Sequence, residues 1–187
     1  LTMLLHFLRS KNLFALHAAY LTKEGINILF PGNSGCGKTT IATNLLRFGF
    51  SCQADDISFL SRSNSKVKVY PFPRRKLLAN HHVKRIKTHN AYSYYKIGSI
   101  PNIIIFPHIT LLRKSKLIPL SSDEAVMRIA TNFVFSPEPD EDICSKDMKL
   151  LKDLTAQSPT YLLLSGIDIK ESPSRLYCLL QGLTEMK

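Results

Sequence analysis

Three groups of residues near the N-terminus could do chemistry on phosphate. The run from Gly32 to Thr39 fits G-x-x-x-x-G-K-[ST] at every defined position. Two adjacent aspartates, Asp55 and Asp56, follow 17 and 18 residues after Lys38, and His17 precedes the run. Such a loop holds phosphates, and carboxylates beside it can hold a metal ion or accept a proton. The combination therefore predicts nucleotide binding and, with the aspartates, phosphoryl transfer.

The loop residues have separate expected tasks. Glycines allow backbone N–H groups to turn inward around phosphate oxygens, and the following helix N-terminus adds partial positive charge. Lys38 should reach the β- and γ-phosphates of ATP, and Thr39 should ligate Mg²⁺. Cys36 is either a redox-sensitive thiol or a tolerated loop residue whose backbone binds. The expected nucleotide-binding set is Gly32, Asn33, Ser34, Gly35, Cys36, Gly37, Lys38, Thr39 and Thr40.

The aspartate pair has a structural and a functional interpretation. Adjacent residues on an extended segment point to opposite faces, so at most one carboxylate should face the phosphate squarely. The structural alternative is a polar turn pair that caps the next segment. The upstream phosphate loop favours function.

The segments around these residues predict alternating strands and helices. Residues 25–30 form an apolar strand pattern, and residues 38–48 have helical spacing that ends near Gly49. Strand patterns follow in 50–60, 66–72, 102–107, 109–120 and 159–166, and helical patterns in 121–135, 144–157 and 172–183. Ser121 and Glu124 form a capping-box pattern, and Pro173 suits a first helical turn. Residues 74–100 predict a loop or a short helix. This alternation indicates one α/β domain over residues 1–187.

The composition of the chain indicates where the protein is located. The chain begins at Leu1, so we expect the domain to lack an N-terminal region. No apolar run is long enough for a membrane span, and no signal layout is present. Four cysteines without metal-type spacing favour reduced thiols in the cytoplasm.

The net charge of +11 is unevenly distributed, because no acidic residue lies between Asp56 and Asp123. This basic stretch is either a solvated face or a surface for an anionic partner. Arg74, Arg75, Lys76 and Arg128 are further candidates for contact with phosphate, although a surface role is the simpler interpretation. Tyrosines among basic residues give a weak nucleic-acid signal, but no nucleic-acid module surrounds them, so we do not expect that partner.

Residues 14–60 resemble the HPr kinase/phosphorylase family and its kinase-like relatives. The resemblance rests on "LHAAYL", "ILFPGNSGCGKTT" and "GFSCQADD" in that order. The segments "VYPFPRRKLL" and "PLSSDEAVMRI" extend it more weakly. It implies a P-loop kinase core related to phosphoenolpyruvate carboxykinase, with a central mixed sheet and flanking helices. The glycine-rich signature of the true HPr enzymes is missing, so the chain is more similar to the stand-alone relatives.

The resemblance also implies roles. Asp55 corresponds to the base towards a serine hydroxyl, and His17 to the active-site histidine near that aspartate and the phosphate. Asp56 corresponds to the second aspartate, which organises metal or water. The implied activity is an ATP- and Mg²⁺-dependent serine kinase acting on a protein or peptide, with homo-oligomerisation left open. The alternatives are a nucleotide-binding regulatory module without turnover and, on charge alone, a nucleic-acid-linked ATPase.

Overall fold

The computed structural model describes residues 7–72, 98–134 and 141–184, with the backbone alone described at 141–144 and 184. The strands are β1 (Phe14–Lys23), β2 (Ile26–Pro31), β3 (Ser51–Ala54), β4 (Ile57–Ser63), β5 (Lys66–Pro71), β6 (Ile103–Ile109), β7 (Lys116–Pro119) and β8 (Thr160–Ser165). The helices are α2 (Lys38–Leu46), α4 (Ser122–Ala130), α5 (Glu141–Gln157), α6 (Ile167–Glu171) and α7 (Pro173–Thr184). One further helical turn covers residues 7–10.

The strands form a single mixed sheet in the order β5-β4-β1-β2-β6-β8-β7, with β3 paired to β1. The β2–β6 and β6–β8 pairs are parallel, and the other pairs are antiparallel. The carboxyl ends of β2, β6 and β8 therefore lie at one edge. Ligands of open α/β sheets bind beyond such an edge. The predicted α/β class with a central mixed sheet and flanking helices is confirmed.

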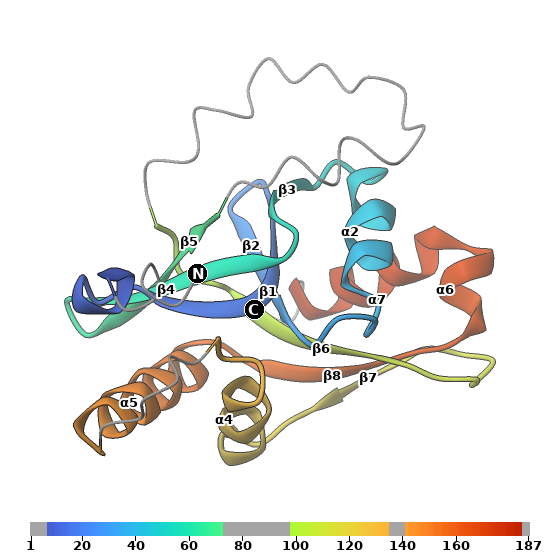
Figure 1. Ribbon diagram of the computed structural model, residues 1–187. Helices are drawn as coiled ribbons and strands as arrows, with labels where there is room; N and C mark the ends of the chain where they lie inside the picture. The colour runs from blue at the N-terminus through green and yellow to red at the C-terminus, as the bar shows by residue number, and fades with distance from the viewer. Residues whose placement is uncertain (1–6, 73–97, 135–140, 185–187) are drawn as a thin grey trace.

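Helices cover both faces of the sheet (Figure 1). One apolar core joins the sheet to α4 and α5, and includes Tyr20, Leu60 and Ile129. The second core joins the opposite face to α2, α6 and α7, and includes Phe30 and Leu45. Because strand residues alternate between faces, even-numbered positions of β1 from 16 to 20 belong to the first core, whereas Ala19 and Leu21 belong to the second.

Two tight turns fix the antiparallel register on the β1 side. Lys23 pairs with Ile26 across Glu24 and Gly25, whose φ angles are 48° and 82°. A two-residue hairpin turn with both φ values positive matches the twist of the flanking strands. Residues 64 and 65, with φ values of 49° and 61°, connect β4 to β5 in the same way.

Most predicted elements are present, and several boundaries differ. The 50–60 pattern divides into β3 and β4 at the bend formed by residues 55–56. Only residues 116–119 of the 109–120 pattern form a strand beyond β6, because 110–115 connect the two strands. The capping box of Ser121 and Glu124 is confirmed, but α4 ends at Ala130, before the predicted residue 135. The predicted loop or short helix at 74–100 lies mostly outside the described residues.

The central strand β1 and the short helix α6 were not predicted. β1 is buried along most of its length and pairs with β2, β3 and β4. Within the described part of the chain, no helix is both long and apolar enough to cross a membrane.

Candidate active site

The phosphate loop connects the end of β2 to the start of α2. Gly35 and Gly37 have φ angles of 85° and 104°, values that side-chain-bearing residues rarely adopt. Gly37 is the N-cap of α2 and provides no side-chain cap, and the first turn contains no acidic residue. Unbonded N–H groups and partial positive charge remain at such an end. The local geometry therefore suits an anion such as a phosphate group.

Lys38 is buried inside this loop, with 6% of its surface exposed. Its Nζ donates hydrogen bonds to the carbonyl oxygens of Gly32 at 2.5 Å and Asn33 at 2.9 Å, and lies 3.9 Å from Cys36 Sγ. Burial lowers the pKa of Lys38, while Cys36 and Asp56 partly oppose that shift. A partly desolvated ammonium whose direct hydrogen-bond acceptors are carbonyl oxygens would gain from a phosphate oxygen. These residues thus fit the phosphates of ATP.

His17 connects three segments around the loop. Its backbone N–H donates to the carbonyl oxygen of Asn132 at 2.9 Å, and its own carbonyl accepts from Gly32 N–H at 3.1 Å. Its Nε2 lies 2.8 Å from Oδ1 of Asp56. The start of the phosphate loop, the aspartate pair and the end of α4 are therefore held at one residue.

The two aspartates occupy different surroundings. Asp56 pairs with His17, and its backbone carbonyl accepts from Ala18 N–H at 3.1 Å. Asp55 lies close enough to Cys52 to act on its thiol: burial, assisted by the Asp55 charge, raises the pKa of Cys52 to about 12. Both aspartates are partly exposed. The resemblance implied that His17 lies near Asp55, but the aspartate that pairs with His17 in the structure is Asp56.

The pKa of His17 is lowered from 6.5. Burial is the largest cause and the charge of Lys38 is the second, and the charge and hydrogen bond of Asp56 only partly offset them. Neutral His17 is therefore favoured at neutral pH, so Nε2–H donates to the Asp56 carboxylate. The charges of Lys38, Asp56 and His17 therefore influence one another.

The candidate site contains oxygen atoms that could act as ligands for magnesium. Thr39 is exposed on the first turn of α2, and Asp56 is exposed in part. In the described residues, no cluster of three or more His, Cys, Asp or Glu side chains could hold a metal ion. Magnesium at nucleotide sites is bound by one or two protein groups together with phosphates and water, so a hydroxyl and a carboxylate suit it.

The other predicted candidates have different outcomes. Arg74, Arg75 and Lys76 lie outside the described residues, and Arg128 is exposed in the last turn of α4. The described cysteines, Cys36, Cys52 and Cys178, are free thiols.

The sequence did not predict that Pro107 and Ile109 lie beside the phosphate loop. A Cβ added at Gly37 would lie 3.4 Å from Cγ1 of Ile109, and one added at Gly32 would lie 3.7 Å from Cδ of Pro107. The end of β6 therefore packs against the loop. The rule that parallel strands bring their carboxyl ends together could have predicted this contact, had β2 and β6 been recognised as neighbours.

Comparison with known proteins found a likeness in structure but none in sequence. No protein-family model matches the chain, and no curated protein matches it. Among solved structures, the chain is similar to the HPr(Ser) kinase/phosphatase from Coxiella burnetii, with 15% sequence identity and a TM-score of 0.47. The match covers 92% of this chain and 97% of that chain.

Proposed function

We propose that this protein is an ATP- and Mg²⁺-dependent kinase that transfers the γ-phosphoryl group to a serine hydroxyl of a protein or peptide. The observation that carries the proposal is the pairing of His17 with Asp56 beside the buried Lys38. A phosphate loop alone supports nucleotide binding. A carboxylate and an imidazole held next to its lysine add groups that can manage a proton and a metal ion.

Each residue has a defined part in this proposal. The loop amides and Lys38 hold the β- and γ-phosphates, and Thr39 and Asp56 hold the metal ion. Bound magnesium would neutralise charge on the phosphate oxygens. His17 fixes the orientation of Asp56 through the 2.8 Å contact. Asp55 accepts the proton of the serine hydroxyl, the role that the resemblance over residues 14–60 implies.

The bond changes balance without a further reactant. The serine oxygen forms a bond to the γ-phosphorus while the bond from that phosphorus to the bridging oxygen of ADP breaks. The serine proton passes to Asp55 and then to solvent, and ADP leaves with the electron pair of the broken bond. Charge spreads over the transferred group as this occurs, and the nearby Lys38 stabilises it.

Label transfer tests the proposal against a module that only binds nucleotide. The protein is incubated with γ-labelled ATP, magnesium and serine-containing peptides, alongside Lys38→Ala and a Lys146→Glu control on the exposed face of α5. We expect labelled phosphoserine with wild type and the control, and none with Lys38→Ala. Tight ATP binding without label transfer to any peptide would instead indicate the non-catalytic module.

A further inference from the structure

The connection between β6 and β7, residues 110–115, presents large apolar side chains to solvent. Leu111 is 92% exposed and Leu112 is 44% exposed. The next two residues, Arg113 and Lys114, are also exposed. Several exposed apolar side chains grouped together mark an interaction site more often than isolated ones do.

The first half of this connection is held firmly against the end of β8. Thr110 donates to the carbonyl oxygen of Ser165 from its backbone N–H at 2.9 Å and from Oγ1 at 3.2 Å. Ile167 N–H donates to the carbonyl oxygen of Leu112 at 2.8 Å. The backbone that displays both leucines is therefore fixed in place.

The second half is held through Ser115, which is buried. Ser115 N–H lies 2.9 Å from Oδ2 of Asp168, and Ser115 Oγ donates to Oδ1 at 2.5 Å. Gly166 N–H in turn donates to Ser115 Oγ at 2.8 Å. A side chain at Gly166 would collide with the carbonyl oxygen of Leu112, at 2.6 Å from its Cβ. The loop is thus pre-ordered, which lowers the entropy cost of binding a partner.

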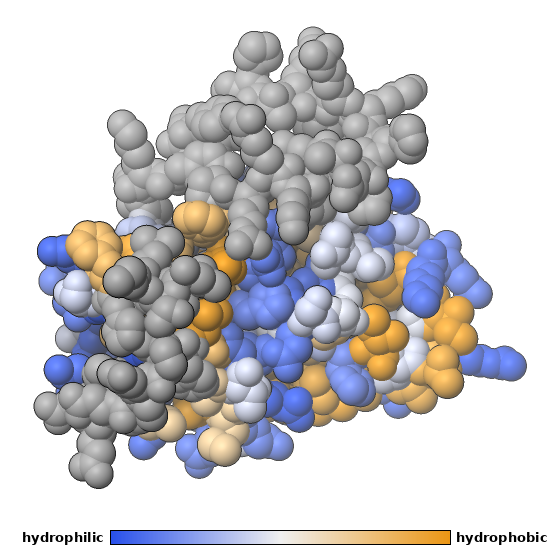
Figure 2. Space-filling model, viewed as in Figure 1, coloured by the Kyte–Doolittle hydropathy of each residue, from blue (hydrophilic) through white to orange (hydrophobic). Residues whose placement is uncertain are grey.

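This loop is continuous with the candidate active site. Ile109, 49% exposed, immediately precedes it and packs beside Gly37 of the phosphate loop. Ile167, 41% exposed, adjoins it through the hydrogen bond to Leu112. Apolar and hydrophilic surfaces meet on the side of the molecule where α6 and the β6–β7 connection lie (Figure 2). A partner bound to this loop would therefore lie next to the phosphate loop.

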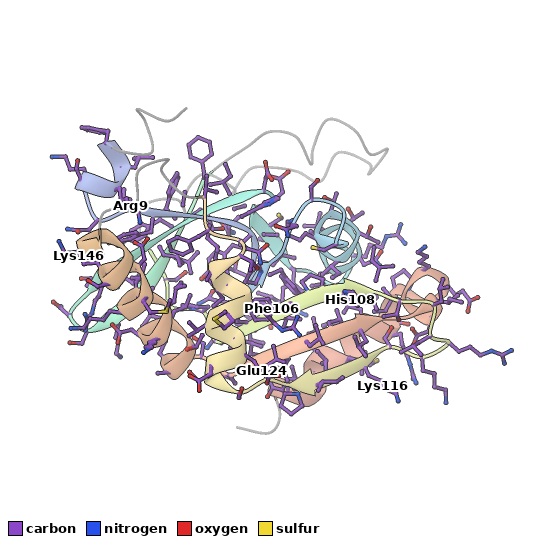
Figure 3. All side chains as sticks on the ribbon, turned by 60° about the horizontal axis from the view of Figure 1, so that its bottom comes forward. Arg9, Phe106, His108, Lys116, Glu124 and Lys146 are labelled. Atoms are coloured by element: carbon purple, nitrogen blue, oxygen red, sulfur yellow. The ribbon has the colours of Figure 1, made fainter. Side chains whose placement is uncertain are left out.

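The charge of the loop selects among partners. Arg113, Lys114 and Lys116 are exposed, and Lys116 lies at the end of the molecule away from Lys146 (Figure 3). Asp168, the carboxylate packed against the loop, already accepts from Ser115 and lies 3.7 Å from Arg175 Nε. The exposed charge of the loop itself is therefore positive. Leucines beside cations match a polypeptide carrying apolar and acidic side chains, whereas nucleic acid would leave the leucines unused.

We propose that the docking surface formed by Ile109, Leu111, Leu112, Arg113, Lys114 and Ile167 binds the polypeptide substrate through apolar and acidic side chains flanking the acceptor serine. The inference rests on the proposed kinase function. Leu111 is the apolar anchor, and Arg113 and Lys114 pair with the acidic side chains. The nucleotide lies on the other side of Ile109, in the phosphate loop.

Peptide binding tests this surface without turnover. Two fluorescent synthetic peptides each carry one serine flanked by leucines, one with Asp and Glu beside them and its twin with Lys at the same positions. Fluorescence anisotropy is measured with a non-hydrolysable ATP analogue present. The test variants are Leu111→Asp and Arg113→Glu/Lys114→Glu. The matched controls are Met127→Asp, at a residue 65% exposed on α4, and Lys146→Glu/Lys149→Glu on exposed positions of α5.

We expect wild type and both controls to bind the acidic peptide, and both test variants to lose about tenfold in affinity. The charge-reversed variant should gain affinity for the lysine twin, a result that a merely unfolded protein cannot give. Affinity for the ATP analogue should stay unchanged. The same pattern should appear as a raised KM for the peptide when transfer is measured.

Three results would overturn the inference. One is that wild type binds neither peptide, or binds both equally. Another is that the test variants lose affinity for the ATP analogue as much as for the peptide, which would assign the surface to the nucleotide. The last is that charge reversal abolishes binding of a short RNA while peptide binding persists. If peptide binding depends on the loop but no label is transferred, the docking surface is supported and the proposed kinase activity is contradicted.

Discussion

The imidazole of His17 on β1 and the carboxylate of Asp56, in the bend between β3 and β4, lie 2.8 Å apart, although the two residues flank the phosphate loop in the sequence. Leu16 and His17 on β1 pair with Ser58 and Ile57 on β4, so strand register brings Asp56 beside the histidine. Lys38 then acts electrostatically on both. A nucleotide phosphate placed at this lysine would lie near the carboxylate of Asp56 and a neutral imidazole.

Acid should destabilise the protein through His17. Its pKa lies below 6.5 in the folded chain because burial and Lys38 disfavour the imidazolium, whereas an unfolded histidine titrates near 6.5. Between the two values the unfolded state binds more protons, so the free energy of unfolding falls as the pH drops through 6.5 towards the folded-state pKa. Urea unfolding at several pH values should show a weaker fall for His17→Gln.

The matched control for this prediction is His108→Gln, at an exposed histidine. This variant should keep the wild-type pH profile. An NMR titration that placed the pKa of His17 at or above 6.5 would contradict the description of its environment.

Nucleotide binding should raise the pKa of His17. Phosphate charge at Lys38 offsets the positive charge that disfavours the imidazolium. Calorimetric titration with an ATP analogue near pH 6.5, in buffers of different ionisation enthalpy, should therefore show greater proton uptake by wild type than by His17→Gln. Equal uptake by the two proteins would mean that the phosphate does not bind near His17.

Gly37 should tolerate no side chain. Its φ of 104° is unfavourable for L-residues, and an added Cβ would lie 3.4 Å from Ile109. We expect Gly37→Ala to lower the free energy of unfolding by about 1–3 kcal/mol and to weaken ATP binding. Thermal denaturation and nucleotide titration check both effects. Gly182→Ala on α7, where an added Cβ meets no neighbouring atom within 4 Å, should lose neither stability nor affinity.

Ser115 should hold the docking surface in place. Ser115→Ala leaves Gly166 N–H and one Asp168 oxygen without their hydrogen bonds to Oγ, so the free energy of unfolding should fall by about 1–3 kcal/mol. Hydrogen exchange should increase at Gly166 and Ile167. Ser174→Ala, at an exposed serine on α7, is the control and should change neither measurement. Unaltered exchange in Ser115→Ala would show that this residue does not order the loop.

The helices and strands that were predicted correctly are those that a short stretch of sequence specifies by itself. The Ser121–Glu124 capping box, the helical spacing after Lys38 and the apolar run of β6 each specify their own backbone, and each element is present. Strand β1 was missed because it is buried on both faces, so "FALHAAYLTK" has no alternation of apolar and polar residues.

The sequence predicted which residues form the candidate site but not how those residues are arranged in space. The motif identified the phosphate loop, because its glycines and lysine act through local backbone geometry. The pairing of His17 with Asp56, and the contact of Ile109 with the loop, depend on strand order and register. Those features are set by long-range packing, which a single sequence does not display.

Phosphoserine formation by wild type, Asp55→Asn and Asp56→Asn tests the central claim most directly. Label transfer from γ-labelled ATP to a serine peptide is measured in a single turnover, with ATP affinity determined for each protein. We predict transfer by wild type and a fall of at least about a hundredfold in Asp55→Asn at nearly unchanged ATP affinity. Asp56→Asn should also require more magnesium. Undiminished transfer by Asp55→Asn, or no transfer by wild type, would contradict the account.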